Sequence, residues 1–105
     1  MPGQSKFIHS VYFWLNEGLG EAEAVELRDG CLSHLAKIPG VLRLSVGFPA
    51  GTERSVVDGS YAVGLLVEFA GKAEHDYYQV HPDHKVFIEI CHRLCSRVQV
   101  YDTIL

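Results

Sequence analysis

Apolar residues alternate with other residues along four segments of the chain, a pattern typical of β-strands, whose side chains point to opposite faces in turn. The predicted strands cover residues 6–15, 41–48, 61–69 and 97–104. In the first strand, one face carries Phe7, His9 and Val11, and the other carries Ile8 and Trp14. Both faces are largely apolar, so we expect both to be covered in the folded protein.

Two longer segments repeat apolar residues every three or four positions, which predicts amphipathic helices over residues 21–37 and 82–96. A shorter helical segment is expected over residues 72–78. The buried stripes expected for the two long helices are Ala24, Leu27, Cys31, Leu35 and Ile38 in the first and Val86, Phe87, Ile90, Cys91 and Leu94 in the second. In the second strand, the residues expected to share one face are Leu42, Leu44, Val46 and Phe48.

The predicted order of elements is strand, helix, strand, strand, helix, strand, with residues 1–105 forming one domain. This is the βαββαβ pattern of a ferredoxin-like α+β fold, in which helices cover one face of a four-stranded antiparallel sheet. The other face would expose Ile8, Tyr12, Trp14 and Leu66. We therefore expect a homodimer that forms through the open sheet face, with a modest apolar patch on a monomer as the alternative.

Charge and composition exclude several classes of partner. The chain has nine basic and thirteen acidic residues, a net charge of −4 and no basic cluster, so we expect no nucleic-acid partner. Its longest apolar run is far shorter than the roughly 20 residues that span a bilayer, so we expect no membrane insertion. The first residues lack the pattern of a secretory signal, so we expect none, and the three cysteines are an odd number, which favours a cytoplasmic protein without disulfides.

Residues 76–88 gather side chains that can move protons near neutral pH. Tyr78, His81 and His84 lie close together in sequence at the predicted start of a helix, on either side of Pro82. If this helix packs on the first strand, His84 and Tyr78 can meet His9 in one apolar pocket. There a neutral imidazole can act as a base, and the phenol can donate a hydrogen bond to a substrate oxygen. The alternative is structural, because a histidine at a helix start often caps the helix and a neighbouring tyrosine often packs.

A metal site is a weaker interpretation of the same segment. His81 and His84 are three residues apart, and Cys91 and Cys95 follow on the same helix, so a mixed zinc site is conceivable. No second pair of ligands occurs at a recognised spacing, and buried cysteines usually only pack. The chain also has no glycine-rich phosphate loop and no serine nucleophile motif. We therefore predict no metal and no cofactor.

Four segments carry a resemblance to a known family. They are Phe7-Ile8-His9-Ser10-Val11-Tyr12-Phe13-Trp14-Leu15, Ile38-Pro39-Gly40-Val41, Tyr78-Gln79-Val80-His81-Pro82-Asp83-His84 and Val98-Gln99-Val100-Tyr101-Asp102. In this order, they resemble the opening strand, the turn after the first helix, the Tyr-x-x-His-Pro-x-His signature and the closing strand of stress-responsive A/B barrel (Dabb) domain proteins. The resemblance covers nearly the whole chain.

This resemblance implies a ferredoxin-like protomer and a dimer whose two sheets form a barrel. One plant member of the family closes a linear polyketide by aldol condensation without a cofactor. By similarity to it, His84 would be the general base, Tyr78 would orient or protonate the carbonyl oxygen, and His9 would lie in the pocket. The residues expected to contact a small carbonyl-bearing or aromatic ligand are His81, Phe7, Val11, Phe87 and Ile88. The alternatives are a ligand-binding or stress-response protein without catalysis and a cofactor-free monooxygenase.

Overall fold

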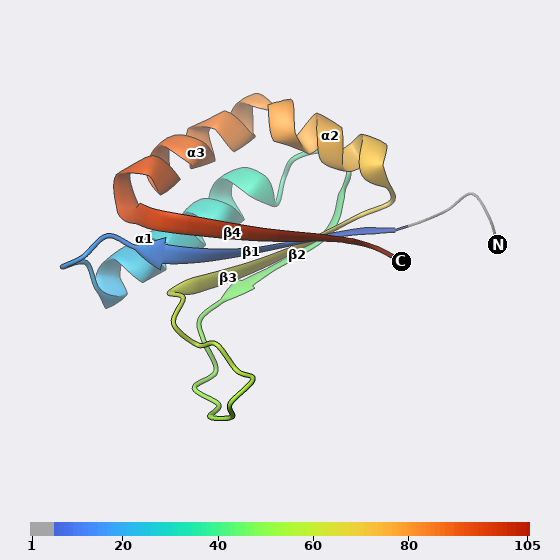
Figure 1. Cartoon of the computed structure of the whole chain (residues 1–105). Coiled ribbons are helices and arrows are strands. Elements are labelled where there is room, and N and C mark those ends of the chain that lie inside the picture. Colours follow the sequence, from blue (N-terminus) through green and yellow to red (C-terminus); the bar gives the residue numbers. More distant parts are fainter. Residues whose placement is uncertain (1–5) are drawn as a thin grey trace.

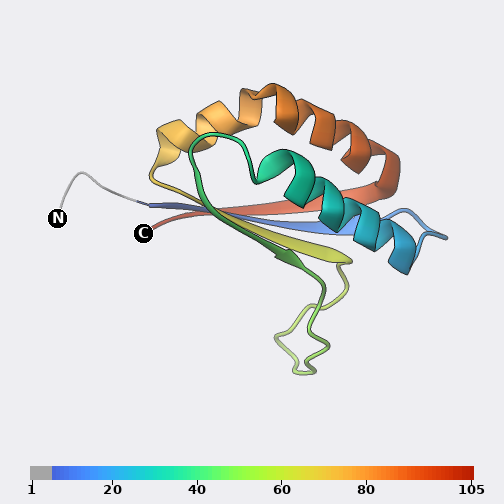
Figure 2. The same cartoon turned by 180° about the vertical axis from the view of Figure 1, so that it is seen from behind.

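Four antiparallel strands form one sheet, and all the helices lie on one of its faces (Figures 1 and 2). The computed structural model describes residues 6–105. The elements in chain order are β1 (Phe7–Leu15), α1 (Glu21–Gly30), η1 (Cys31–Leu35), β2 (Val41–Gly47), β3 (Val63–Phe69), α2 (Lys72–Val80), α3 (Pro82–Leu94) and β4 (Cys95–Ile104). The strand order is β2-β3-β1-β4. This confirms the predicted ferredoxin-like α+β fold. The predicted domain also includes residues 1–5, on which the expectation of no secretory signal partly rests, and these lie outside the residues that the structure describes.

The central strand β1 fixes which side chains face the helices. It pairs with β3 on one side and β4 on the other, and its register sets His9 opposite both Val67 and Asp102. Along β1, Phe7, His9, Val11 and Phe13 are buried, whereas the residues between them are only partly buried. His9 therefore lies on the inner face of the sheet, as its alternation with apolar residues predicted.

The helices cover this face with the stripe expected from the first helical segment. Its five members are all buried: Ala24, Leu27, Cys31, Leu35 and Ile38. Burying a side chain such as that of Leu27 stabilises a fold by about 1.5–3 kcal/mol. In the second long helix, Phe87, Cys91 and Leu94 are buried, but Val86 is 43% exposed, so its predicted burial was wrong. Phe87 and Cys91 are one helical turn apart, and the face they define turns Val86 towards solvent.

The first helical segment is not one continuous α-helix. It is α-helical to Gly30 and then continues as the wider π-helical turn η1, in which the Ala36 N–H donates to the Cys31 carbonyl at 3.3 Å. Gly30 lies against α3: a Cβ atom there would lie 3.3 Å from the Cδ1 of Ile90. The small residue thus allows the close approach of α1 and α3.

Two further details of the strands and helices differ from the prediction. The register of β2 shifts between Val41 and Arg43, which leaves Leu42 57% exposed and not on the inner face with Leu44. A bulge of this kind breaks the simple alternation on which the prediction relied. Helix α3 ends at Leu94, two residues early, because Cys95 already has extended backbone angles and pairs with β1.

The sheet face away from the helices carries a partly exposed apolar surface. Ile8, Tyr12 and Trp14 are partly buried there, and Leu66 is 39% exposed. The segment joining β2 and β3 extends beyond the sheet on this same side (Figures 1 and 2). Across residues 6–105, no helix has the length and apolar character that a membrane span requires.

Candidate functional site

A cavity of about 400 Å³ lies between the inner face of the sheet and helices α2 and α3. Its wall is largely apolar, and Val11, Phe87 and Ile88, which the sequence placed at the ligand site, all line it. The polar side chains on the wall include His9, His75, Tyr78, Gln79, His84 and Asp102. The volume falls within the range of small-molecule pockets, about 300–1,000 Å³.

The three residues expected to carry the chemistry meet in this cavity. His9 comes from β1, Tyr78 from α2 and His84 from α3. The ring of Tyr78 stands edge-on to both imidazoles, with its centroid 4.9 Å from that of His84 and 5.8 Å from that of His9. The phenol therefore lies between two potential bases, although the catalytic role of all three residues stays a prediction.

Two other residues predicted to contact a ligand do not line the cavity. The ring of Phe7 stacks on that of His75, with centroids 4.3 Å apart, so Phe7 supports the cavity wall from behind. His81 is the N-cap of α3: its Nδ1 accepts a hydrogen bond from the Asp83 N–H at 3.0 Å. This contact is the structural alternative considered for the histidines of this segment, and His81 is not among the residues that line the cavity.

Asp102 is a member of the site that the sequence interpretation missed. Its Oδ1 lies 2.6 Å from the Nδ1 of His9. Because a carboxylate can only accept, the Nδ1–H of His9 donates this hydrogen bond, and the Nε2 atom keeps its lone pair. The available signal was the alternation of the last strand, where Asp102 follows Val98 and Val100 on the same face.

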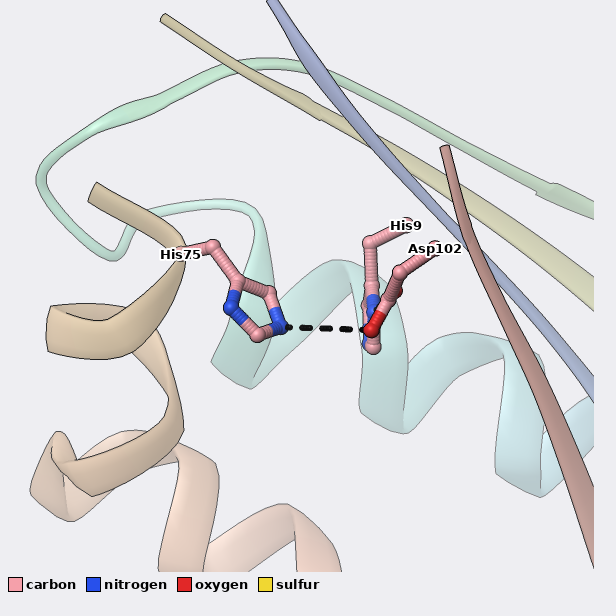
Figure 3. Close-up of side chains that lie close together, drawn as sticks. All are labelled: His9, His75 and Asp102. Atoms are coloured by element: carbon pink, nitrogen blue, oxygen red, sulfur yellow. Dashed lines mark hydrogen bonds and ion pairs between the residues drawn. The ribbon is translucent and has the colours of Figure 1, made fainter. Parts of the chain in front are cut away.

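His75 is a second missed member. Its Nε2 lies 4.0 Å from the Oδ2 of Asp102, so this carboxylate stands between two imidazoles (Figure 3). His75 lies three residues before Tyr78 in α2 and therefore on the same face of that helix. This spacing was a signal that the expected helix over residues 72–78 already contained.

The surroundings favour neutral imidazoles and a protonated phenol. Burial lowers the pKa of His9, and the hydrogen bond and charge of Asp102 offset only part of this effect. Burial also lowers the pKa of His84, with smaller contributions from His9 and His75. Burial raises the pKa of Tyr78 well above its usual range. Near neutral pH the cavity thus contains neutral imidazoles, each with one nitrogen free to accept a proton, and a phenol that keeps its proton.

The cysteines do not form the zinc site considered from the sequence. Cys31, Cys91 and Cys95 are all free thiols, and burial raises the pKa of Cys31 to about 12. Within residues 6–105, the one group of three or more side chains able to hold a metal ion is His9, His75 and Asp102. Within these residues, His81 and His84 therefore do not form a group of metal ligands with Cys91 and Cys95.

Solved structures share this fold over nearly the whole chain. A dimeric ferredoxin-like protein of unknown function from Thermobifida fusca has a TM-score of 0.81 at 19% identity and covers 100% of this chain and 94% of its own. A Dabb family protein from Mesorhizobium loti has a TM-score of 0.78 at 23% identity, with coverage of 97% and 98%. The hydroxynitrile lyase of Passiflora edulis has a TM-score of 0.73 at 17% identity, with coverage of 95% and 93%. At these identities the likeness establishes the fold alone.

Sequence comparison gives the family. No protein with a curated description matched the chain. The stress responsive A/B barrel domain, Dabb, matches residues 7–105, which include every element of the fold and every residue of the cavity. The four segments on which the resemblance rested lie inside this match. The chain therefore belongs to the stress responsive A/B barrel (Dabb) domain family.

Proposed function

We propose that the cavity binds a small carbonyl-bearing or aromatic compound and that His84, Tyr78 and His9 move protons on it. The observation that carries the proposal is the meeting of these three side chains, from three different elements, in one largely apolar cavity. An apolar pocket with a few convergent polar groups is the usual form of a small-molecule site. The neutral state favoured for the imidazoles supports the same interpretation.

Each residue has a distinct task in the proposed reaction. His84 takes a proton from the carbon next to the carbonyl group, which leaves an enolate. Tyr78 donates a hydrogen bond to the carbonyl oxygen, where the negative charge develops. His84 then returns the proton, or the enolate carbon attacks a second carbonyl group of the same molecule and the proton goes to the new alkoxide. The second course is an aldol addition, the carbon–carbon bond-forming step of an intramolecular aldol condensation, which is the reaction type implied by the family resemblance.

His9 acts beside this pair as a second base of fixed orientation. The hydrogen bond to Asp102 places the proton on Nδ1, so the Nε2 of His9 can accept a proton or a hydrogen bond from the ligand. Asp102 is a positioning residue in this scheme, because it acts through His9. The name of the Passiflora edulis neighbour adds that one protein with this fold acts on hydroxynitriles.

Deuterium exchange into a simple aromatic ketone tests the proposal. Metal-free protein is incubated with acetophenone in D₂O, and the loss of the methyl proton signal is followed by NMR. We expect the protein to accelerate exchange and His84→Gln to abolish the acceleration, whereas Lys85→Gln, at an exposed neighbouring position, leaves it unchanged. Acetophenone binding without exchange would favour the alternative, a ligand-binding protein without catalysis. Absence of both binding and exchange would overturn the proposal for this class of ligand.

We further propose that the protein is a homodimer that forms through the open sheet face. This face carries Ile8, Tyr12, Trp14 and Leu66, and apolar surface on a sheet face is stabilised when a second sheet covers it. The structural neighbour from Thermobifida fusca is described as dimeric. Because the cavity lies on the opposite side of the sheet, such a dimer leaves both cavities accessible.

We also infer a cytoplasmic location. Cys31, Cys91 and Cys95 are free thiols, and small proteins of oxidising compartments usually pair their cysteines. Fractionation of cells that express the full chain tests this: recovery from the periplasmic or extracellular fraction would contradict it.

A further inference from the structure

We propose that His9, His75 and Asp102 form a binding site for a divalent transition-metal ion such as Zn²⁺ on the wall of the cavity. The three side chains come from β1, α2 and β4, and each offers one ligand atom within 4.8 Å of the other two (Figure 3). Two imidazoles and one carboxylate are a ligand set that binds Zn²⁺ in proteins. The site goes beyond the proposed proton transfer, which requires no metal.

The hydrogen bonds of His75 favour its role as a ligand. Its Nδ1 lies 3.2 Å from the Oδ1 of Asp76, which can only accept, so the proton of a neutral His75 is on Nδ1. The Asp76 carboxylate is itself bound by Lys72, 2.7 Å away. The Nε2 atom then presents a lone pair, to which the side-chain amide of Gln79 donates at 3.3 Å. Metal-binding histidines are commonly oriented in this way, with the second nitrogen donating to a carboxylate.

The Nε2 of His75 also lies near a carboxylate oxygen. The Oδ2 of Asp102 lies 4.0 Å from the His75 Nε2. A cation placed between this nitrogen and this carboxylate would attract both, and it would replace the hydrogen bond from Gln79. Ligand distances of about 2.0–2.2 Å in a tetrahedral zinc site separate neighbouring donor atoms by about 3.4 Å, so a small side-chain movement suffices.

His9 completes the set after a local rearrangement. Its Nδ1 donates to the Oδ1 of Asp102 at 2.6 Å, closer than two ligands of one tetrahedral ion, so binding through Nδ1 requires the proton of His9 to move to Nε2 and the carboxylate to move away. The Asp102 side chain is 37% exposed, which leaves it room to rotate. With three protein ligands, the ion keeps one position for water or for an oxygen atom of a cavity ligand.

Calorimetry with Zn²⁺ alone, on protein free of any histidine tag, tests the site. We expect one ion per chain and an affinity that falls at least about tenfold in His75→Ala and in Asp102→Asn. His34→Ala, at a partly buried histidine in η1 outside the cluster, should bind as the unmodified protein does. Unchanged affinity in His75→Ala, or no saturable binding below about millimolar Zn²⁺, would overturn the proposal.

A second measurement does not depend on any variant folding. In the unmodified protein, ¹⁵N NMR of the imidazoles should show the Nε2 of His75 shifting on addition of Zn²⁺, with His34 unaffected. Co²⁺ in place of Zn²⁺ should give the visible absorption of a four-coordinate ion with nitrogen ligands. His75 could instead carry protons on both nitrogens and show no ¹⁵N shift on addition of Zn²⁺. In that case an ion pair with Asp102 explains the geometry, and the proposed metal site is overturned. No ketone is present, so failure here leaves the proposed function standing.

Discussion

The Nδ1 of His9 lies 2.6 Å from the Oδ1 of Asp102, and the two residues are direct partners across β1 and β4. The contact joins a buried imidazole to a carboxylate that is still partly exposed. It fixes which nitrogen of His9 carries the proton and leaves the other nitrogen as an acceptor. The antiparallel register of β1 and β4 thus fixes the orientation of the His9 imidazole, which neither residue would fix alone.

The first prediction concerns Asp102→Asn. Burial lowers the pKa of His9, and Asp102 raises it, so removing the carboxylate should lower the His9 pKa further. The asparagine amide can also donate to Nδ1, which would move the proton to Nε2. NMR titration of His9 measures both effects, with Asp29→Asn at an exposed site as the control. An unchanged His9 pKa would mean that the hydrogen bond is absent in solution.

The second prediction separates the hydroxyl of Tyr78 from its ring. Tyr78→Phe keeps the edge-on contact with Phe69, whose centroid lies 5.0 Å away, so we expect little change in thermal stability. Loss of a donor to the developing oxyanion should slow ketone exchange by about 100-fold or more. Tyr77→Phe, at a half-exposed position on the same helix, is the matched control and should retain full activity. Equal rates in the two variants would remove Tyr78 from the mechanism.

The third prediction is a loss of stability in acid. The folded-state pKa values of His9 and His84 are lowered, so below the unfolded value of about 6.5 the unfolded chain binds more protons than the native protein. The free energy of unfolding should therefore fall as the pH drops from about 6.5 through the folded-state pKa values. Denaturant unfolding of metal-free protein between pH 7.5 and 5 measures this.

The control for this stability effect is His84→Gln, which removes one of the two groups. Its free energy of unfolding should depend less steeply on pH over the same interval than that of the unmodified protein. If both proteins gave the same slope, His84 would not be held neutral by burial.

The fourth prediction tests the dimer. Leu66→Glu places a carboxylate on the open sheet face, and burying it unpaired between two apolar sheets costs several kcal/mol. The dissociation constant of the dimer should rise at least about tenfold, as measured by light scattering over a concentration series. Val86→Glu, at a similarly exposed position on α3, should leave the dimer intact. A monomer without any substitution, or a dimer broken equally by both variants, would contradict the proposed interface.

The parts of the site that could be predicted from sequence were those that follow from the repeat of apolar residues within one strand or one helix. Alternation along the first strand placed His9 on the inner face, and helical spacing placed His84 beside Phe87. Asp102 and His75 were missed for a different reason. Their contacts cross between elements far apart in the chain, and only the register of β1 with β4 and the packing of α2 bring them to His9.

The wrong parts of the prediction have local physical causes. The bulge in β2 exposed Leu42, and the buried face of α3 excluded Val86. His81, which was expected to contact a ligand, accepts a hydrogen bond from the Asp83 N–H as a helix cap, and its contact with a ligand stays a prediction. Residue type alone cannot separate these roles, because both need an imidazole at the start of a helix.

The pH dependence of ketone exchange tests the central claim most directly, because it reports the protonation state of the proposed base. In metal-free protein, the rate should rise with pH through a value below about 6.5 and then level off, since burial lowers the pKa of His84. The account predicts that His84→Gln removes this rise together with most of the activity, and that Lys85→Gln keeps both. A rate that is the same in His84→Gln, or that rises only in alkaline solution, would contradict it.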